Sequence, residues 1–139
     1  MTAAVSTVVV DTSAAVAVIF GEPGSEELLG HLEDAESRLM SAATRVELGI
    51  VVEGRLGLEG SEVVARFLRD ADIETAGVDG EAAERALGGW RRYGKGRHAA
   101  ALNFGDCFAY GLAEWVGGPV LCTGNDFAAT DIDLLRPSE

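Results

Sequence analysis

A run of three valines that ends in an acid and two hydroxyls is the stretch that most constrains this chain. Residues 8–10 are all valine, and they lead directly into Asp11, Thr12 and Ser13. A continuous β-branched run is typical of a strand buried on both faces of a parallel sheet. We therefore expect Asp11 at the carboxyl end of that strand, the edge where open α/β sheets bind ligands. The structural alternative is that Asp11, Thr12 or Ser13 only caps the helix predicted over residues 14–20.

The rest of the chain alternates between strand-like and helix-like segments. We predict further strands over residues 38–41, 73–78 and 120–123, with a last edge strand around 132–135. We predict helices from residue 25, over 42–56, 61–71 and 80–90, and from about 103 to 116. Strands that alternate with helices favour an α/β fold with a mainly parallel sheet covered on both faces. A length of 139 residues, 47% of them hydrophobic, suits a single domain over residues 1–139 with one core.

Charge and hydropathy narrow the functional classes. The formal net charge of −12 argues against non-specific binding of nucleic acids, because affinity for phosphate comes from Lys and Arg side chains that displace counterions. It does not exclude a nuclease, since the carboxylates of a metal site add to the negative count. No apolar run approaches the roughly 20 residues that span a bilayer, and the N-terminus lacks the pattern of a signal peptide. We therefore expect a cytoplasmic protein that does not bind membranes.

Four acids occupy positions that a parallel sheet would bring together. Asp11 and Asp126 each follow an apolar strand directly. Asp106 begins a predicted helix, and Glu47 lies in the second turn of the helix over residues 42–56. Such a cluster of like charges is costly unless cations or protons compensate it, and carboxylate oxygens suit hard cations such as Mg²⁺. The ordinary alternative for an isolated glutamate such as Glu47 is a solvated position on a helix surface.

Hydroxyls and basic side chains flank these acids in the sequence. Thr12, Ser13 and Thr123 stand beside the proposed ligands, where they either cap helices or orient carboxylates and bound water. A basic segment that follows the helix over residues 80–90 contains several glycines and is predicted to form a mobile loop. The candidate RNA contacts in this segment are Arg91, Arg92, Lys95, Arg97 and His98.

The remaining metal-binding residue types favour no other site. His31 is expected on a helix surface, and neither it nor His98 shows the spacing of a metal ligand. Cys107 and Cys122 stand in apolar surroundings without the paired spacing of a zinc site or a disulfide framework, so we expect two reduced core residues.

Four segments together resemble PIN-domain ribonuclease toxins of the VapC type, which belong to type II toxin-antitoxin systems. The similarity covers nearly the whole chain in the right order, and the third and fourth segments, at their mutual spacing, are the specific ones. The segments are residues 8–14 (VVVDTSA), 45–48 (RVEL), 102–110 (LNFGDCFAY) and 121–132 (LCTGNDFAATDI).

The resemblance implies a compact three-layer α/β/α sandwich and Mg²⁺- or Mn²⁺-dependent cleavage of RNA. It puts Asp11, Glu47, Asp106 and Asp126 at the acidic positions of the family, as catalytic and metal-binding residues. It also implies a homodimer and a small antitoxin that covers the active site, and structured RNAs such as tRNA are common targets in the family. The glycine-rich segment around Lys95 carries no role over from the family.

Other functions fit the residues less well. In an aspartyl phosphotransfer enzyme a strand-end Asp becomes phosphorylated, but Asp11 is not followed by a second acid two residues on. A receiver domain would place a lysine at a strand end, and Lys95 is the only lysine. A catalytically silent module that binds RNA or a protein is the alternative from another class, and the presence of all four acids argues against it.

Overall fold

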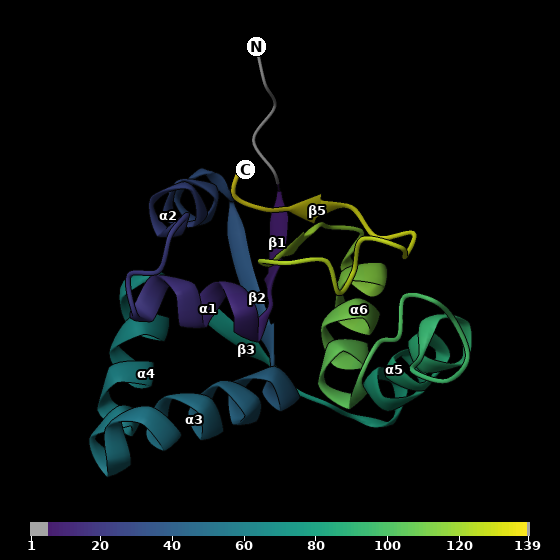
Figure 1. The fold of residues 1–139 in the computed structure, drawn as a ribbon, viewed down its shortest axis with the longest axis horizontal. Helices are drawn as coiled ribbons and strands as arrows, with labels where there is room; N and C mark the ends of the chain where they lie inside the picture. Colours follow the sequence, from purple (N-terminus) through teal and green to yellow (C-terminus); the bar gives the residue numbers. More distant parts are fainter. Residues whose placement is uncertain (1–5, 139) are drawn as a thin grey trace.

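A parallel sheet of five strands forms the centre of the computed structural model, which describes residues 6–138 (Figure 1). The strands are β1 (Thr7–Val10), β2 (Ser37–Ser41), β3 (Ile73–Ala76), β4 (Val120–Leu121) and β5 (Leu134–Leu135). Their order across the sheet is β3-β2-β1-β4-β5, and every pairing is parallel. The strand that was predicted first is therefore the central one, and its carboxyl end lies at the middle of one sheet edge.

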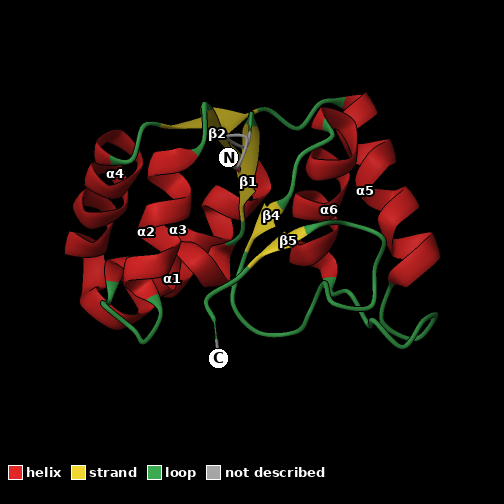
Figure 2. Cartoon of the chain, turned by 90° about the horizontal axis from the view of Figure 1, so that it is seen from above, coloured by secondary structure: helices red, strands yellow, loops and turns green. Residues whose placement is uncertain are grey.

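Helices cover both faces of the sheet (Figure 2). Four of them, with a short 3₁₀ turn, lie on one face, and the other two lie on the opposite face. The first group is α1 (Thr12–Ile19), α2 (Ser25–Asp34), α3 (Ala42–Leu56), η1 (Gly57–Glu59) and α4 (Gly60–Asp70). The second group is α5 (Gly80–Tyr93) and α6 (Phe104–Val116). The predicted α/β/α fold with a parallel sheet is confirmed.

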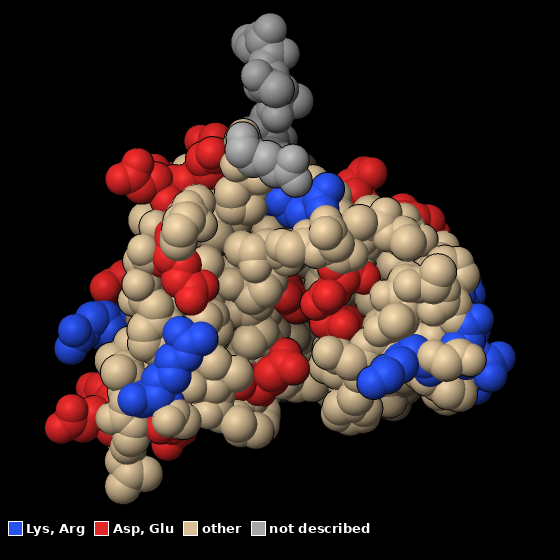
Figure 3. Space-filling view, viewed as in Figure 1, with Lys and Arg blue, Asp and Glu red and all other residues tan. Residues whose placement is uncertain are grey.

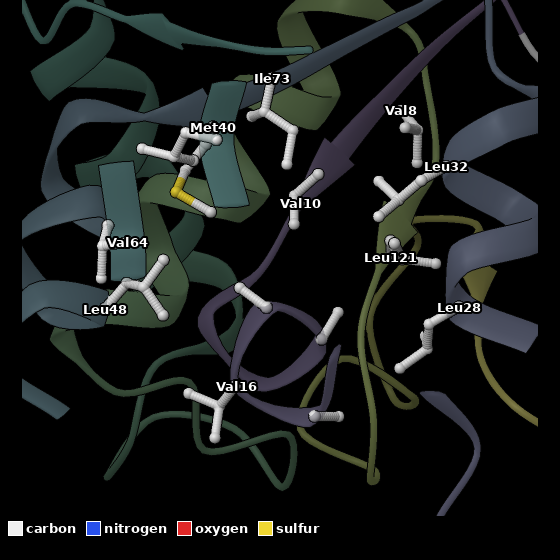
Figure 4. Close-up of a cluster of buried hydrophobic side chains, with 14 of the residues drawn as sticks. Val8, Val10, Val16, Leu28, Leu32, Met40, Leu48, Val64, Ile73 and Leu121 are labelled. Carbon is white, nitrogen blue, oxygen red and sulfur yellow. The ribbon is translucent and has the colours of Figure 1, made fainter. Parts of the chain in front are cut away.

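The valines of β1 divide the interior into two cores. Val8 and Val10 pack into the cluster beneath α1 to α4 (Figure 4), whereas Val9 packs into the cluster beneath α5 and α6. All three are fully buried, which is the burial predicted from the uninterrupted valine run. Removal of such a side chain from water contributes about 1.5–3 kcal/mol. The central strand is thus held from both sides, and the residue that follows it has little freedom to move.

Several element boundaries differ from the sequence predictions. The helix α5 continues to Tyr93 instead of ending near Trp90, because the turn that stops it is set by Gly94. A side chain at Gly94 would overlap the ring of Trp90, so glycine allows the chain to leave the helix there. The third strand ends at Ala76, two residues earlier than predicted. No helix within residues 6–138 is long and apolar enough to cross a membrane.

Candidate active site

Asp11 stands at the carboxyl end of β1 and begins helix α1. Its side chain caps the helix: Oδ2 accepts hydrogen bonds from the Ser13 backbone N–H at 3.1 Å and from Ser13 Oγ at 2.6 Å. Its backbone N–H donates to the Leu121 carbonyl on β4 at 3.0 Å. The side chain is buried, with 5% of its surface exposed. Asp11 therefore both caps a helix and sits at the ligand-binding edge, so the two interpretations of this residue are compatible.

Asp106 is fixed by a capping box at the start of α6. Its Oδ2 accepts from the Asn103 backbone N–H at 3.1 Å, and its own N–H donates to Asn103 Oδ1 at 2.9 Å. Asn103 is therefore the N-cap of α6. Asp106 is also buried, with 7% exposed. Both buried acids are thus oriented by backbone groups within three residues of them.

Glu47 reaches the same region from α3 and is not a solvated surface residue. The helix begins at its cap Ser41, and Glu47 follows in the second turn, half-buried. Its Oε1 accepts a hydrogen bond of 2.5 Å from Thr12 Oγ1. A Cβ at Gly105 would lie 2.5 Å from Glu47 Oε2, so the missing side chain at Gly105 makes room for this carboxylate beside the start of α6. Glu47 therefore lies between Thr12 and the first turn of α6, which carries Asp106.

Asp126 lies on the loop between β4 and β5 and is exposed. The neighbouring Phe127 is buried in the α5–α6 core, with 1% exposed. Further along the loop, the hydroxyl of the fully buried Tyr110 donates to Asp131 Oδ1 at 2.7 Å. Arg136 Nη1 donates to the Gly124 carbonyl at 3.0 Å. The loop is thus held on both sides of Asp126, whereas no hydrogen bond within residues 6–138 fixes the Asp126 carboxylate itself.

Ser13 joins the buried acid to this loop. Its Oγ donates its proton to Asp11 and accepts the Thr123 backbone N–H at 3.0 Å. Ser13 therefore orients a carboxylate, as Thr12 does for Glu47, which is the role that the sequence left open for both hydroxyls. Thr123 takes part through its backbone N–H.

The electrostatics show that the four acids act on one another. Burial, the largest cause, and the charges of Asp11, Asp126 and Glu47 together raise the pKa of Asp106 to about 7, against the opposing effect of the Asn103 hydrogen bond. Burial also raises the pKa of Asp11, with a contribution from Glu47, while the bonds from Ser13 lower it. Figure 3 shows Asp and Glu atoms gathered in the hollow between the two helical layers. The acids predicted from the sequence are therefore brought together.

The donor set suits a hard divalent cation, although no compact ligand cage is present. Among residues 6–138, no group of three His, Cys, Asp or Glu side chains stands in an arrangement that would hold a metal ion as it is. Mg²⁺ does not require such a cage, because it keeps several waters and is bound through one or two carboxylates together with substrate phosphates. Burial and then the neighbouring acids raise the pKa of Asp106, and a bound cation would oppose both effects by stabilising the carboxylate. The carboxylates of Asp11 and Asp106 fit that mode of binding.

The basic segment lies on the α5 side, apart from the acidic hollow (Figure 3). Arg91 and Arg92 belong to the last turn of α5, and Arg92 forms an ion pair of 2.7 Å with Glu114. Arg97 stacks over the ring of Trp90, with its guanidinium carbon 4.7 Å from the ring centre. His98 accepts the Ala100 N–H through Nδ1 and packs on Tyr93.

Backbone hydrogen bonds give the loop of this segment a defined conformation, where its glycines predicted a mobile one. The Lys95 N–H donates to the Leu102 carbonyl, and the Leu102 N–H donates to the Tyr93 carbonyl, so the two ends of the loop are joined. The N–H groups of Arg97 and His98 both donate to the Gly94 carbonyl. The candidate RNA contacts are therefore presented on an ordered rim.

Some contacts around the site were not identified from the sequence. Tyr110 and Asp131 lie within the segments 102–110 and 121–132, but their pairing depends on the fold. Gly105 lies in the first of these segments, and its contact with Glu47 has no signal in the sequence. Arg136 has no local signal in the sequence either. Burial and the charges of the nearby acids, Asp11 most of all, raise the pKa of Cys122 to about 12, and the charge of Arg136 opposes this rise.

The predicted cysteine state agrees with the structure, since Cys107 and Cys122 are both buried and free. His31 is a half-buried residue of α2, within its last turn. Neither residue type contributes to the acidic cluster, so oxygen ligands dominate the chemistry of this edge.

Comparison with known proteins gives one family match and several similar sequences. The model of the PIN domain family matches residues 8–133. "Ribonuclease VapC" of Mycolicibacterium smegmatis is 44% identical over 124 residues, which cover 89% of this chain and 96% of that protein. "Ribonuclease VapC42" of Mycobacterium tuberculosis is 42% identical over 125 residues, covering 89% of this chain and 95% of that one.

Solved structures share the fold at low sequence identity. The Mycobacterium tuberculosis VapC20 toxin, described as cleaving the sarcin-ricin loop, aligns with a TM-score of 0.75 at 17% identity and covers 94% of this chain and 99% of that one. VapBC2 from Rickettsia felis, bound to a promoter DNA fragment, aligns with a TM-score of 0.74 at 12% identity over 95% of this chain and 99% of that one. At these identities the likeness concerns the fold alone.

Proposed function

The chain belongs to the PIN domain family, and from this premise we propose that it is a metal-dependent endoribonuclease, the toxin of a type II toxin-antitoxin pair. The observation that carries the proposal is the mutual effect of four carboxylates at one sheet edge: Asp11, Asp126 and Glu47 all raise the pKa of Asp106. The VapC ribonucleases to which it is 42–44% identical support the reaction class.

Each acid has a role that follows from its position. Asp11 and Asp106, buried and fixed by backbone hydrogen bonds, would hold the cation, with the exposed Asp126 joining when the substrate is present. Glu47, held by Thr12, would orient the attacking water or complete the coordination. The chemistry expected of bound Mg²⁺ or Mn²⁺ is activation of water and neutralisation of charge at the scissile phosphate. Burial of the two fixed acids strengthens these interactions by lowering the local dielectric.

A nuclease assay tests this function directly. Purified protein is incubated with total RNA in EDTA, in Mg²⁺ and in Mn²⁺, beside an Asp106→Asn variant that keeps the shape of the side chain. Cleavage is expected only with a divalent cation and only in the protein with Asp106 intact. Cleavage that persists in EDTA would overturn the metal dependence. Absence of cleavage under all conditions would favour the catalytically silent module.

The phosphotransfer alternative gains no support from the fold. Lys95 lies on the rim of the loop after α5, not at a strand end beside Asp11, so the cation that a receiver domain would need is missing from that position. Hydrolysis of a phosphodiester bond remains the chemistry that the four acids suit best.

We also propose that a small basic antitoxin, encoded beside this protein, covers the acidic hollow. A cluster of carboxylates attracts an arginine or lysine side chain that would compete with the metal. A groove of about 540 Å³, lined by apolar residues such as Ile19, Leu29 and Phe67 together with acidic and basic side chains, offers apolar surface for an amphipathic helix. The VapBC2 structure from Rickettsia felis supports this assembly by analogy.

Co-expression with the adjacent upstream reading frame tests the antitoxin. The expected result is a complex that purifies together and does not cleave RNA. Failure to co-purify, or full activity within the complex, would contradict the proposal.

A homodimer is the proposed assembly, as the family resemblance implies, and exposed apolar residues of α3 and η1 support it. Val46 and Ile50 on α3 are 63% and 69% exposed, and Leu58 in η1 is 87% exposed. Exposed apolar side chains on one face mark an interaction surface, and two-fold dimers are the commonest soluble assembly. Light scattering at micromolar concentration should give a dimer for the wild type and a monomer for Ile50→Lys, with Val78→Lys as the control. A monomeric wild type would contradict the dimer.

The remaining expectations follow from this function. A structured RNA such as tRNA is the proposed class of substrate, and the cytoplasm is the proposed site of action. We propose that residues 1–139 act as one domain, which the single sheet of residues 6–138 supports.

A further inference from the structure

An apolar groove opens between α5 and the start of α6, directly beside the acidic site. It has a volume of about 620 Å³ and shares Asn103 with the capping box of Asp106. The residues that line it are Ala83, Ala86, Leu87, Trp90, Lys95, Leu102, Asn103, Phe104, Cys107 and Phe108. None of the four acids contributes to this groove, and the assigned family function gives it no role.

Phe104 is the unusual residue of this groove. It is 81% exposed, although it lies only two positions before the buried Asp106 and next to Gly105, which contacts Glu47. Its ring is held edge-on against Phe108, with ring centres 5.0 Å apart. An exposed aromatic ring has a cost in water unless a ligand covers it. The position therefore offers a flat apolar face within a few residues of the reacting centre.

Cations and a second aromatic ring stand around the same groove. Trp90 is 39% exposed on α5, and Arg97 stacks over its ring. Lys95, which lines the groove, forms no ion pair within residues 6–138. In a chain of net charge −12, a lysine without an ion pair within residues 6–138 and an arginine stacked on Trp90 beside exposed aromatics are a local exception. Proteins that bind single-stranded nucleic acid combine these two features, a basic path for the backbone and rings on which bases stack.

We propose that this groove binds an unpaired nucleobase of the RNA next to the scissile phosphate, with Phe104 as the stacking platform and Lys95 near the adjoining phosphate. The proposal rests on the ribonuclease function above and names a subsite for it. Apart from Lys95 and Asn103, the lining offers no polar side chain to read a base edge. Recognition is therefore by stacking, which tolerates different bases and requires a base that is out of a duplex.

The groove suits a base better than a protein helix for two reasons. It adjoins the acid site at Asn103, whose backbone N–H donates to Asp106, so a ligand there lies next to the reacting phosphate. Its charged lining residue is Lys95, which suits an RNA phosphate, whereas the 540 Å³ groove is lined by three acids and two arginines and has no excess of positive charge for RNA.

Binding and kinetics of Phe104→Ala, Phe104→Trp and Trp115→Ala test the proposal. Trp115 is a matched control, since it is a 62% exposed aromatic of the same helix that contacts Arg85 outside the groove. The probes are a fluorescent single-stranded RNA of ten nucleotides and its duplex, with anisotropy measured in EDTA. Cleavage of the same single strand is then followed with Mn²⁺.

The expected result is weaker binding of the single strand by Phe104→Ala, by about 5- to 100-fold, the range that loss of one stacked base gives. Phe104→Trp should restore the affinity, and Trp115→Ala and the duplex should be unaffected. In cleavage, the KM should rise more than kcat falls, because stacking binds substrate and transition state alike.

Three results would overturn the subsite. These are wild-type affinity and KM in Phe104→Ala, an equal loss in Trp115→Ala, or loss of co-purification with the antitoxin at unchanged RNA affinity, which would assign the groove to the protein. All three assume that the wild type cleaves RNA. If the wild type does not cleave, the proposed function itself fails, so the two failures are distinguishable.

Discussion

The acids of this site are positioned in two different ways. Asp11 and Asp106 are buried at the start of helices, and backbone N–H groups within three residues fix their carboxylates. Asp126 is exposed on a loop, and its position depends on contacts made by other residues, such as Tyr110 with Asp131. A buried acid gains a fixed orientation but resists ionisation, whereas the exposed acid depends on contacts made by its neighbours.

This difference suggests a division of labour within the site. Under the proposed function, the fixed acids would hold a cation at the middle of the sheet edge, where β1 and β4 lie side by side. The loop acid would add its charge when substrate enters. Rigid elements matter for the fixed acids because a displacement of about 1 Å in a catalytic group is costly for the reaction rate.

The largest expected effect comes from the fixed acids. Asp106→Asn and Asp11→Asn should each lower RNA cleavage by at least about 100-fold. This is the largest loss expected when a residue that only supports a metal ligand is changed, and loss of a ligand itself should cost no less. The amide keeps the shape and part of the hydrogen bonding while removing the charge. Asp34→Asn, at the end of α2, is the control and should cleave normally. Undiminished cleavage by the purified Asp106→Asn protein would remove this residue from the site.

The loop side of the comparison is tested at Tyr110. Tyr110→Phe removes the hydroxyl that holds Asp131, so cleavage should fall by roughly 10-fold. The free energy of unfolding should fall by only about 1 kcal/mol. Asp131→Asn, which keeps the accepting oxygen, should retain more activity than Asp131→Ala. Initial rates with Mn²⁺, together with denaturant unfolding, measure both effects. Equal activity of all these variants would show that the loop needs no such support.

Ser13 connects the two regions and is expected to give a smaller effect. Ser13→Ala leaves the Thr123 N–H without its partner and Asp11 with one hydrogen bond fewer. Cleavage should fall by several-fold, and stability by about 1–3 kcal/mol, the cost of an unsatisfied buried group. Ser13→Thr keeps the hydroxyl and serves as the control. If Ser13→Ala matches the wild type in both measurements, the two regions are independent.

The smallest effect concerns the cost of burying Asp106 without metal. Its pKa of about 7 in the fold exceeds the value of about 3.9 in an unfolded chain. The folded state therefore binds this proton more tightly, and stability from Asp106 declines as pH rises from about 4 to 7. In EDTA, the Tm of Asp106→Asn minus the Tm of the wild type should increase by about 4 °C when the pH is raised from 5 to 8. A difference that does not change with pH would contradict the raised pKa.

The sequence predicted the parts of the fold that local signals control. The helix over residues 42–56 has the predicted bounds because Ser41 caps it and Gly57 ends it with a positive φ of 75°. The valines of β1 are buried as expected, since only a central strand accommodates three in a row. Both signals act over a few residues, so periodicity and capping rules suffice to identify them.

Contacts between distant segments were beyond the reach of those rules. The four acids could be assembled because strand ends meet at one edge, but the fit of Glu47 against Gly105 depends on how closely α3 approaches α6. The Tyr110–Asp131 bond likewise joins a helix to a loop 21 residues away. The groove beside Phe104 arises from the packing of α5 on α6, and no pattern in either helix alone reveals it.

The parallel order of the sheet also determines when the site exists during synthesis. Central strand β1 leaves the ribosome well before its partner β4, and the Ser13–Thr123 bond spans 110 residues. At about 5–20 residues per second, that separation corresponds to roughly 5–20 s of translation. Until β4 has emerged, this bond between Ser13 and the loop that carries Asp126 cannot form. The proposed four-acid site is therefore completed only after β4 has been made, long after β1 and α3.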